Sequence, residues 1–466
     1  MAKETHIKTD KNPLSAGVLG SYPYIRVSTA LLDPSICETR LGYFQPDPAT
    51  GFTHLNLDDD RMGLHPRQPD NARYCDASRR SDDRPSARTG LPAYAGRRRY
   101  PCLIYGLCAL MIWGSNASAQ TGDIVRIATF AAPLSRDGPG LLLRDITKQD
   151  DAGIAAIVAI INHISPDILI LTDFDYDAGG AGLSAFSDVL ADPYQYKFAL
   201  RPNAGMQTGL DIDGDGFTGD ARDAMGYGRF LGDGGLALLS RSPVDVVNVI
   251  DLTELRWRDV PSAVLPQMNG TAFPSDDVQA MLHVSSSGHW IVPINFGAQT
   301  ITLLVYSATA PVFDGPEDFN GLRNRDELRV WEAVLDGTLA APPTNPIIIG
   351  NVNADPFDGQ GICSGIAGVL ARPDLQDPMP MSLGAKQAAD LNQMGDPALD
   401  TADWSDDGPG NLRVSYILPS RALNVVGAGV FWPAQNDPLA TLLGSDGLTA
   451  GPHRLVWVDI EIEGLR

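Results

Sequence analysis

Residues 347–356, Ile-Ile-Ile-Gly-Asn-Val-Asn-Ala-Asp-Pro, decide how the fold of the chain can be interpreted. Three β-branched residues run into Gly350, and this pattern predicts a buried strand that ends abruptly with polar residues at its tip. In open sheets, groups at strand ends point into the crevice where chemistry takes place. Asn351 and Asn353 are therefore candidate site residues.

The stretches around this strand predict two packed sheets with helices outside, because strands are dense and few helices separate them. Residues 151–164 have apolar positions at helical spacing, with Asp150 or Asp151 as the cap. A strand pair turned at Pro243 is expected over 236–240 and 244–252. Further strands are expected at 124–130, 168–171, 300–306, 414–418, 425–431 and 456–462, with a second helix at 324–335.

Residues 350–356 resemble the Gly-Asp-x-Asn-Ala-Asp-Pro strand end of the endonuclease/exonuclease/phosphatase superfamily, which includes deoxyribonuclease-like nucleases, sphingomyelinases and inositol-phosphate phosphatases. Residues 311–318, 410–419 and 453–459 look like one secreted bacterial branch of it. The resemblance covers nearly all of 124–462. It implies an α/β (α+β) fold, a four-layer α/β/β/α sandwich of two packed mixed sheets with outer helices. It also implies phosphoester hydrolysis with one or two divalent cations.

The strand tips depart from the pattern that the resemblance implies. The metal-binding Glu corresponds to Asp173, a shorter carboxylate, and the Asp that orients the attacking water corresponds to Asn351, whose amide cannot take a proton. Other family ligands are replaced at Ala131, Ser307, Ser415 and Pro452. His453 remains, but the carboxylate that would orient it is missing, and comparable losses cost other hydrolases about 10⁴ in rate.

These substitutions lead to two hypotheses. The first is a secreted member of the superfamily with eroded catalytic residues, inactive or very weakly active, in which Asn351, Asn353 and His453 are what is left for catalysis. The alternative is an active phosphodiesterase or phosphatase with a non-standard site, acting on a phosphoester small molecule or lipid. Asp173 alone could hold Mg²⁺ or Mn²⁺ weakly. Each survivor also has a structural interpretation: Asp173 could cap a turn, Asn353 could form one, and His453 could be a core or surface histidine.

Charge argues against nucleic acid as a partner. The chain has 35 Lys and Arg against 57 Asp and Glu, a formal charge of −22. Residues 1–119 hold 15 basic and 12 acidic residues, so residues 120–466 hold 20 and 45 and carry a charge near −25. Such a surface repels a phosphate backbone, although a local basic cleft would remain compatible with it.

The first 119 residues look unlike the rest. Residues 1–96 are rich in Pro, Asp, Arg and Ser without a sustained period, and we expect a disordered or mis-called extension. Arg97-Arg98-Arg99, an apolar run over 101–113 and the Ala117-Ser-Ala119 site predict a secretory signal peptide over 97–119, hence a secreted or periplasmic protein; a buried core helix is the other interpretation. The run is too short to span a bilayer, so no transmembrane helix is expected in the mature domain, residues 120–466.

A second motif is independent of catalysis. Asp211, Asp213 and Asp215 alternate and are followed by Gly216, as at the start of an EF-hand-type loop. Asp220 lies close, whereas the twelfth position is Arg222 instead of Glu. The spacing predicts Ca²⁺ bound at 211–220, and an acidic surface turn is the alternative.

Overall fold

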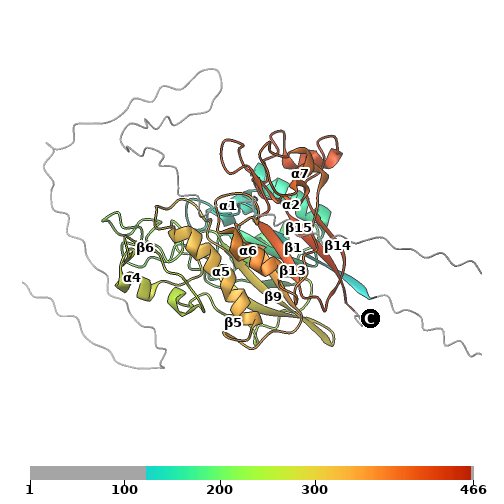
Figure 1. Cartoon of the computed structure of the whole chain (residues 1–466). Helices are drawn as coiled ribbons and strands as arrows, with labels where there is room; N and C mark the ends of the chain where they lie inside the picture. Colours follow the sequence, from blue (N-terminus) through green and yellow to red (C-terminus); the bar gives the residue numbers. More distant parts are fainter. Residues whose placement is uncertain (1–121, 463–466) are drawn as a thin grey trace, which may run out of the picture. The chain divides into compact units, whose positions relative to one another are not determined.

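The computed structural model describes residues 122–462 (Figure 1). The extension expected over 1–96 and the signal peptide expected over 97–119 lie outside these residues. Within 122–462, no helix combines the length and the apolar character needed to cross a bilayer.

One sheet has six strands and is built around β1. Its spatial order is β14 (Asn424–Val430), β15 (Val456–Ile462), β1 (Asp123–Phe130), β2 (Ile168–Phe174), β4 (Gly235–Ser240) and β3 (Tyr196–Phe198). β1 runs parallel to β2 and antiparallel to β15, so the sheet is mixed. Because β1 and β2 are parallel neighbours, their C-terminal ends leave the sheet at the same edge.

The second sheet has five strands and contains the motif strand β10. Its spatial order is β13 (Ser415–Pro419), β10 (Pro346–Asn351), β9 (Gln299–Ser307), β8 (His289–Phe296) and β5 (Ile250–Asp251). β10 runs parallel to β9 and antiparallel to β13, so this sheet is mixed as well. The two remaining strand pairs are short hairpins: β6 (Gln267–Met268) with β7 (Thr271–Ala272), and β11 (Ala402–Asp403) with β12 (Asn411–Leu412).

Helices cover the outer faces of both sheets, which confirms the four-layer sandwich. α1 (Leu141–Lys148), α2 (Ala152–Ile164) and α3 (Ala181–Asp188) pack on the six-stranded sheet. α5 (Phe319–Leu335) and α6 (Cys363–Leu370) pack on the five-stranded sheet and lie in front of it in Figure 1. The short helices are α4 (Asp276–Met281), α7 (Leu383–Gln387), η2 (Trp257–Asp259), η3 (Pro397–Leu399) and η4 (Pro438–Leu443).

The sequence pattern explains this packing directly. In β10, Ile347 and Ile349 belong to the core between the sheets, whereas Ile348 packs under the outer helices. A strand buried on both faces must be apolar at every position, as this one is. At the start of α2, the Asp151 carboxylate accepts the Ile154 N–H at 2.8 Å, so the predicted cap is confirmed.

One predicted strand pairing is wrong. Residues 236–240 form β4, but residues 244–252 contribute only β5, which pairs with β8 in the other sheet. The turn at Pro243 therefore carries the chain from one sheet to the other. In addition, the helix expected at 324–335 begins earlier, at Phe319.

Gly350 fixes how β10 lies against β9. Its φ is +148°, and a Cβ built there would lie 1.8 Å from the Tyr306 carbonyl oxygen. No side chain fits in that space, so Gly350 is required by the strand contact itself.

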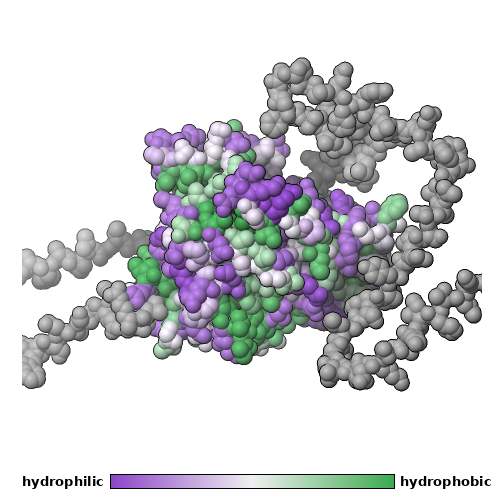
Figure 2. Space-filling view, turned by 180° about the vertical axis from the view of Figure 1, so that it is seen from behind, coloured by the Kyte–Doolittle hydropathy of each residue, from purple (hydrophilic) through white to green (hydrophobic). Residues whose placement is uncertain are grey.

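The face seen from behind in Figure 2 mixes hydrophilic and apolar residues, as most protein surfaces do.

Candidate functional site

Three of the predicted positions form one row across the five-stranded sheet. Asn351 is the last residue of β10, and it pairs with Ser307 of β9 on one side and with Ser415 of β13 on the other. All three residues are buried. The strand register therefore brings them together, and the row that results contains no ionisable side chain.

Asn351 and Asn353 are tied to each other. The Asn351 Nδ2 donates to the Asn353 Oδ1 at 3.0 Å, and the Asn353 Nδ2 donates to the Ala308 carbonyl at 2.7 Å. Asn353 has a φ of +54°, a left-handed conformation that Asn tolerates better than most residues. Within 122–462, the buried Asn351 Oδ1 and Ser415 Oγ accept no hydrogen bond. The row therefore has acceptor capacity left for water or a ligand.

His453 lies in the loop before β15, and no carboxylate of residues 122–462 is paired with it. Its backbone forms a bridge with Ala402, and its ring meets Trp404 edge-on at a centroid distance of 5.1 Å. Burial of the ring, with Arg454 next to it, lowers the pKa of His453 to about 4, and in the described part of the chain its Nδ1 has no partner. The imidazole is therefore neutral at physiological pH.

Thr401 connects His453 with the row. The Thr401 carbonyl accepts the Arg454 N–H at 2.8 Å, and its Oγ1 accepts the Ser415 N–H at 3.0 Å. Thr401 is fully buried. The loop that carries His453 and the start of β13 at Ser415 are therefore held side by side.

The end of β1 lies in the same region as His453. Ala131 directly follows β1 and is buried, and it offers no ligand atom. A Cβ on Gly451 would lie 2.7 Å from Pro133, so the loop after β1 touches the loop that carries Pro452 and His453. Leu134, in the first of these loops, donates its backbone N–H to the Asp173 carbonyl at 3.0 Å. Contacts thus run from Asp173 through these loops to the row.

Asp173 lies near the end of β2, among carboxylates that the sequence interpretation missed. Burial raises the pKa of Asp173 to about 6, and Asp233 adds repulsion. The pKa of Asp175 is raised to about 7, also by burial first and by Asp233 and Asp173 after it. The alternation Asp173-Phe174-Asp175 was visible in the sequence, whereas Asp233 lies in a Gly-rich loop sixty residues away along the chain.

Backbone and arginine donors already occupy much of this acidic group. Asp175 accepts the N–H groups of Arg136 at 3.0 Å and Gly234 at 3.2 Å. Asp233 accepts the Arg229 backbone N–H at 2.9 Å and its Nε at 3.1 Å. Arginines and carboxylates therefore neutralise one another here, which leaves little free positive charge for a phosphate.

The strand tips do not fit a tightly held divalent cation. Such an ion in this family draws on several oxygen ligands, and Mg²⁺ needs near-octahedral oxygen geometry. Among residues 122–462, only the cluster at 211–215 brings three acidic or histidine ligand atoms within 4.8 Å of one another. At the tips, Asp173 has neither Asn at 131 nor Asp at 452 to complete a set. We therefore derive no step through a metal at this position.

A buried carboxylate on α5 supports the row from beneath. Glu327 is fully buried, and it accepts hydrogen bonds from the Ser286 N–H and Oγ at 2.7 and 2.8 Å and from the Thr309 N–H at 2.6 Å. Burial raises the pKa of Glu327 to about 6, because its effect exceeds the opposing effects of Arg323 and of these donors. Glu327 therefore fixes the chain that leaves β9 just after Ser307.

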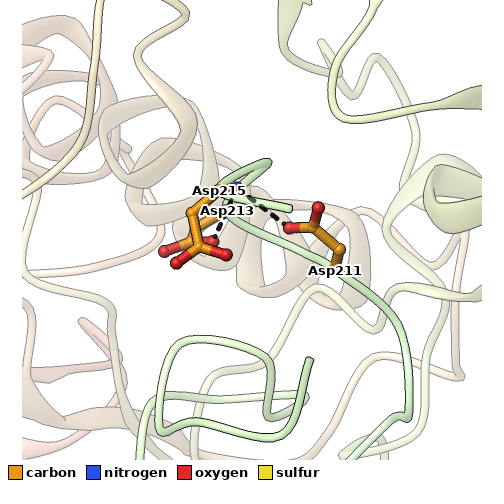
Figure 3. Close-up of side chains that lie close together, drawn as sticks. All are labelled: Asp211, Asp213 and Asp215. Carbon is orange, nitrogen blue, oxygen red and sulfur yellow. Dashed lines mark hydrogen bonds between the residues drawn. The ribbon is translucent and has the colours of Figure 1, made fainter. Parts of the chain in front are cut away.

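Figure 3 shows the acidic turn at Asp211, Asp213 and Asp215, which is remote in sequence from the tips. Their carboxylates lie close enough for one ion, within 4.8 Å. Asp220 is engaged elsewhere, since it accepts the N–H groups of Arg222 at 2.7 Å and Asp223 at 3.3 Å.

Arg222 occupies the position where an EF-hand loop has its Glu. Its Nη1 lies 3.5 Å from Asp213, so a guanidinium compensates part of the charge of the turn. Burial and the neighbouring carboxylates Asp215, Asp220 and Asp223 raise the pKa of Asp213. The turn thus concentrates negative charge that a cation would relieve.

Comparison with known proteins identifies one family. The family model described as Endonuclease/Exonuclease/phosphatase family matches residues 146–446. No curated protein matches the sequence.

Three solved structures are similar to the chain. They are an endonuclease/exonuclease/phosphatase from Beutenbergia cavernae (16% identity, 73% of this chain and 72% of that one, TM-score 0.42), sphingomyelinase C from Streptomyces griseocarneus (15%, 72% and 99%, 0.38) and a 3′ phosphatase from Neisseria bound to a product DNA hairpin (13%, 72% and 100%, 0.37).

Proposed function

The chain belongs to the endonuclease/exonuclease/phosphatase family, whose members act on phosphoesters and typically depend on divalent metals, and we propose that it is an inactive or very weakly active member kept for binding or structure. One observation carries this proposal. The row of Ser307, Asn351 and Ser415 lies at the strand ends of the five-stranded sheet, yet it offers no base and no metal-binding carboxylate.

The neutral imidazole adds to this. A histidine whose pKa is about 4 does not bring positive charge to a phosphate at neutral pH, and without a carboxylate its tautomer is not controlled. Because the catalytic groups of a hydrolase act as a unit, one such loss removes most of the rate. His453 and Asn351 would therefore bind and orient polar groups without cleaving them.

Hydrolysis assays on the full chain test the proposal. The substrates are a generic phosphodiester and a generic phosphomonoester, with Mg²⁺ or Mn²⁺, and Asp173→Ala is assayed beside the wild type. We expect the two proteins to give the same background rate. Turnover that is present in the wild type and lost in Asp173→Ala would refute inactivity.

The alternative, an active phosphodiesterase or phosphatase with a non-standard site, is favoured by a specific observation. Asp175 and Asp233 lie near Asp173 and could together take the place of the missing ligands. In that case, Asp233→Asn would lower the rate as Asp173→Ala does, while Asp277→Asn, an exposed carboxylate on α4, would leave it unchanged.

We further propose that the turn at 211–215 binds Ca²⁺, which would hold the long loop that contains it. Three convergent carboxylates support this proposal. Calorimetry should show a heat of Ca²⁺ binding that Asp213→Ala abolishes and Asp150→Asn retains. The absence of that heat in the wild type would leave an acidic surface turn.

The partners and the location are proposed from charge and sequence. A phosphoester small molecule or lipid suits a domain with a charge near −25 better than nucleic acid does. The Arg cluster, apolar run and Ala-x-Ala site over 97–119 support export to a secreted or periplasmic location. N-terminal sequencing of natively exported protein tests this, and a chain that stays with the cytoplasmic fraction would contradict it.

A further inference from the structure

Six large apolar side chains extend into solvent from the loops that follow β10. Even the least exposed of them, Met381, exposes 48% of its surface, and Leu391 is fully exposed. We call this set the apolar rim: Phe357, Met379, Met381, Leu383, Leu391 and Met394. Single exposed apolar residues are ordinary, but a group of them marks an interaction surface.

Arg413 joins two parts of the apolar rim. Its guanidinium donates to Asp377 at 2.6 and 2.8 Å, and its backbone N–H donates to Asp355 at 2.8 Å. Asp377 in turn accepts the Met379 N–H, and Asp355 accepts the Phe357 N–H. Because both turns are held by the same buried arginine, Phe357 and Met379 lie on neighbouring turns.

Met394 lies next to Phe357. Asp358 accepts the Met394 N–H at 2.9 Å, and a Cβ on Gly395 would lie 3.6 Å from the Phe357 ring. Met381 and Leu383 continue from the Met379 turn into α7, which is labelled at the top of Figure 1. Contacts therefore join the turns of Phe357, Met379 and Met394, and the apolar rim begins four residues beyond Asn353 along the chain.

Negative charge surrounds the apolar rim. Residues 373–412 contain eight Asp and a single Lys, Lys386, and no Arg. Arginines pair with some of these carboxylates, as Arg413 does with Asp377 and Arg454 with Asp403. Within the described range 122–462, the structure pairs no Lys or Arg with a further set of carboxylates around the apolar rim: Asp358, Asp390, Asp396, Asp406 and Asp407.

We propose that the apolar rim docks a basic amphipathic segment of another protein. Its apolar face would cover the methionines, whose flexible thioethers adapt to irregular partners. Its Lys and Arg side chains would meet the carboxylates that pair with no Lys or Arg of the described residues, which speeds association and selects against acidic partners. The same charge repels anionic lipid head groups and a second copy of this acidic chain.

Binding of a labelled synthetic helix built of Leu and Lys to the full chain tests this inference. Fluorescence anisotropy should show saturable binding, and Met379→Gln combined with Met394→Gln should weaken it about tenfold, because central apolar contacts dominate such interfaces. Met281→Gln is the matched control, since Met281 is 52% exposed on α4. Thermal melts check that all variants are folded.

Charge is tested separately. Asp396→Asn combined with Asp406→Asn should slow association and flatten its salt dependence, whereas Asp150→Asn should change neither. The proposal would be overturned if the wild type did not bind the Leu/Lys helix saturably, or if it bound a helix of Leu and Glu equally well. An unchanged affinity in the double methionine variant would also overturn it. So would a wild type that binds vesicles or dimerises without peptide, if the double methionine variant lost that property.

Discussion

The two sheets present opposite chemistry at their neighbouring edges. At the end of β2, burial and the neighbouring Asp233 raise the pKa values of Asp173 and Asp175, and Arg229 donates to Asp233. Across β9, β10 and β13 the row is neutral: Ser307, Asn351 and Ser415. The comparison teaches that the two sheets of one fold can end in groups of different charge, so the fold alone does not determine the chemistry at its strand ends.

The largest effect on the free energy of unfolding is expected from a change at Glu327, which holds the segments next to the neutral row. Glu327→Ala removes the buried acceptor of three hydrogen bonds that tie Ser286 and Thr309 to α5. The stranded donors should lower the free energy of unfolding by about 3–5 kcal/mol. Chemical denaturation measures it, with Glu332→Ala on the same helix as the control. A loss below about 1 kcal/mol would mean that the row does not depend on this carboxylate.

A smaller effect is expected in the row itself. Asn351→Asp restores the carboxylate of the family but places it in a buried site, facing the Asn353 Oδ1 that now accepts from Asn351. The buried carboxylate would have a raised pKa, so its penalty, about 1–3 kcal/mol at pH 7.5, should disappear as the pH falls below about 4.

Asn392→Asp, on an exposed loop, is the control for this substitution. We expect no gain in phosphodiester turnover from Asn351→Asp, because Ala131 and Pro452 remain. A gain would show that one residue separates the neutral row from an active one.

The next prediction concerns a carboxylate beside the row. Burial, with Asp355, Asp358 and Asp390 nearby, raises the pKa of Asp400 to about 7. The unfolded chain releases this proton near pH 4, so the stability that the protonated group contributes is lost as the pH rises from about 4 to 7.

Asp400→Asn should therefore flatten the pH dependence of stability in that window, making the variant about 1–2 kcal/mol more stable than the wild type at pH 8 and little different at pH 4. Denaturation at several pH values measures this. A slope as steep as that of the Asp150→Asn control would show that Asp400 keeps its charge.

The smallest effect on the free energy of unfolding is expected at Asp137, on the exposed side of the carboxylates near the end of β2. Asp137 is largely exposed and contacts Arg229, whose Nε is already bonded to Asp233. Asp137→Ala should change the free energy of unfolding by less than about 0.5 kcal/mol, because exposed ion pairs contribute little. A change above 1 kcal/mol would mean that the charges of this edge act as one network.

Much of the fold followed from the sequence, because buried strands and a capped helix leave periodic signals. The strand that runs into Gly350 was predicted from three isoleucines, and a cap at Asp150 or Asp151 from their place before an apolar period. The pairing of 244–252 was wrong because a proline turn does not say whether a chain returns to its own sheet or crosses to the other.

The site was predicted less completely. Strand register brings Ser307 and Ser415 beside Asn351, and only the family resemblance had singled out these two serines. Asp233 could not be predicted, since a loop that returns beside β2 leaves no local pattern. Nor could the neutral state of His453, which depends on burial by residues distant in sequence.

Gly350 has a consequence for how such proteins are recognised. Because any Cβ there would meet the Tyr306 backbone, selection for a folded chain alone is enough to keep this glycine. Packing therefore explains the glycine of the motif, whereas the side chain at position 351 does not share this backbone constraint. Sequence signatures anchored on such glycines report ancestry, and enzymatic activity has to be established from the side chains beside them.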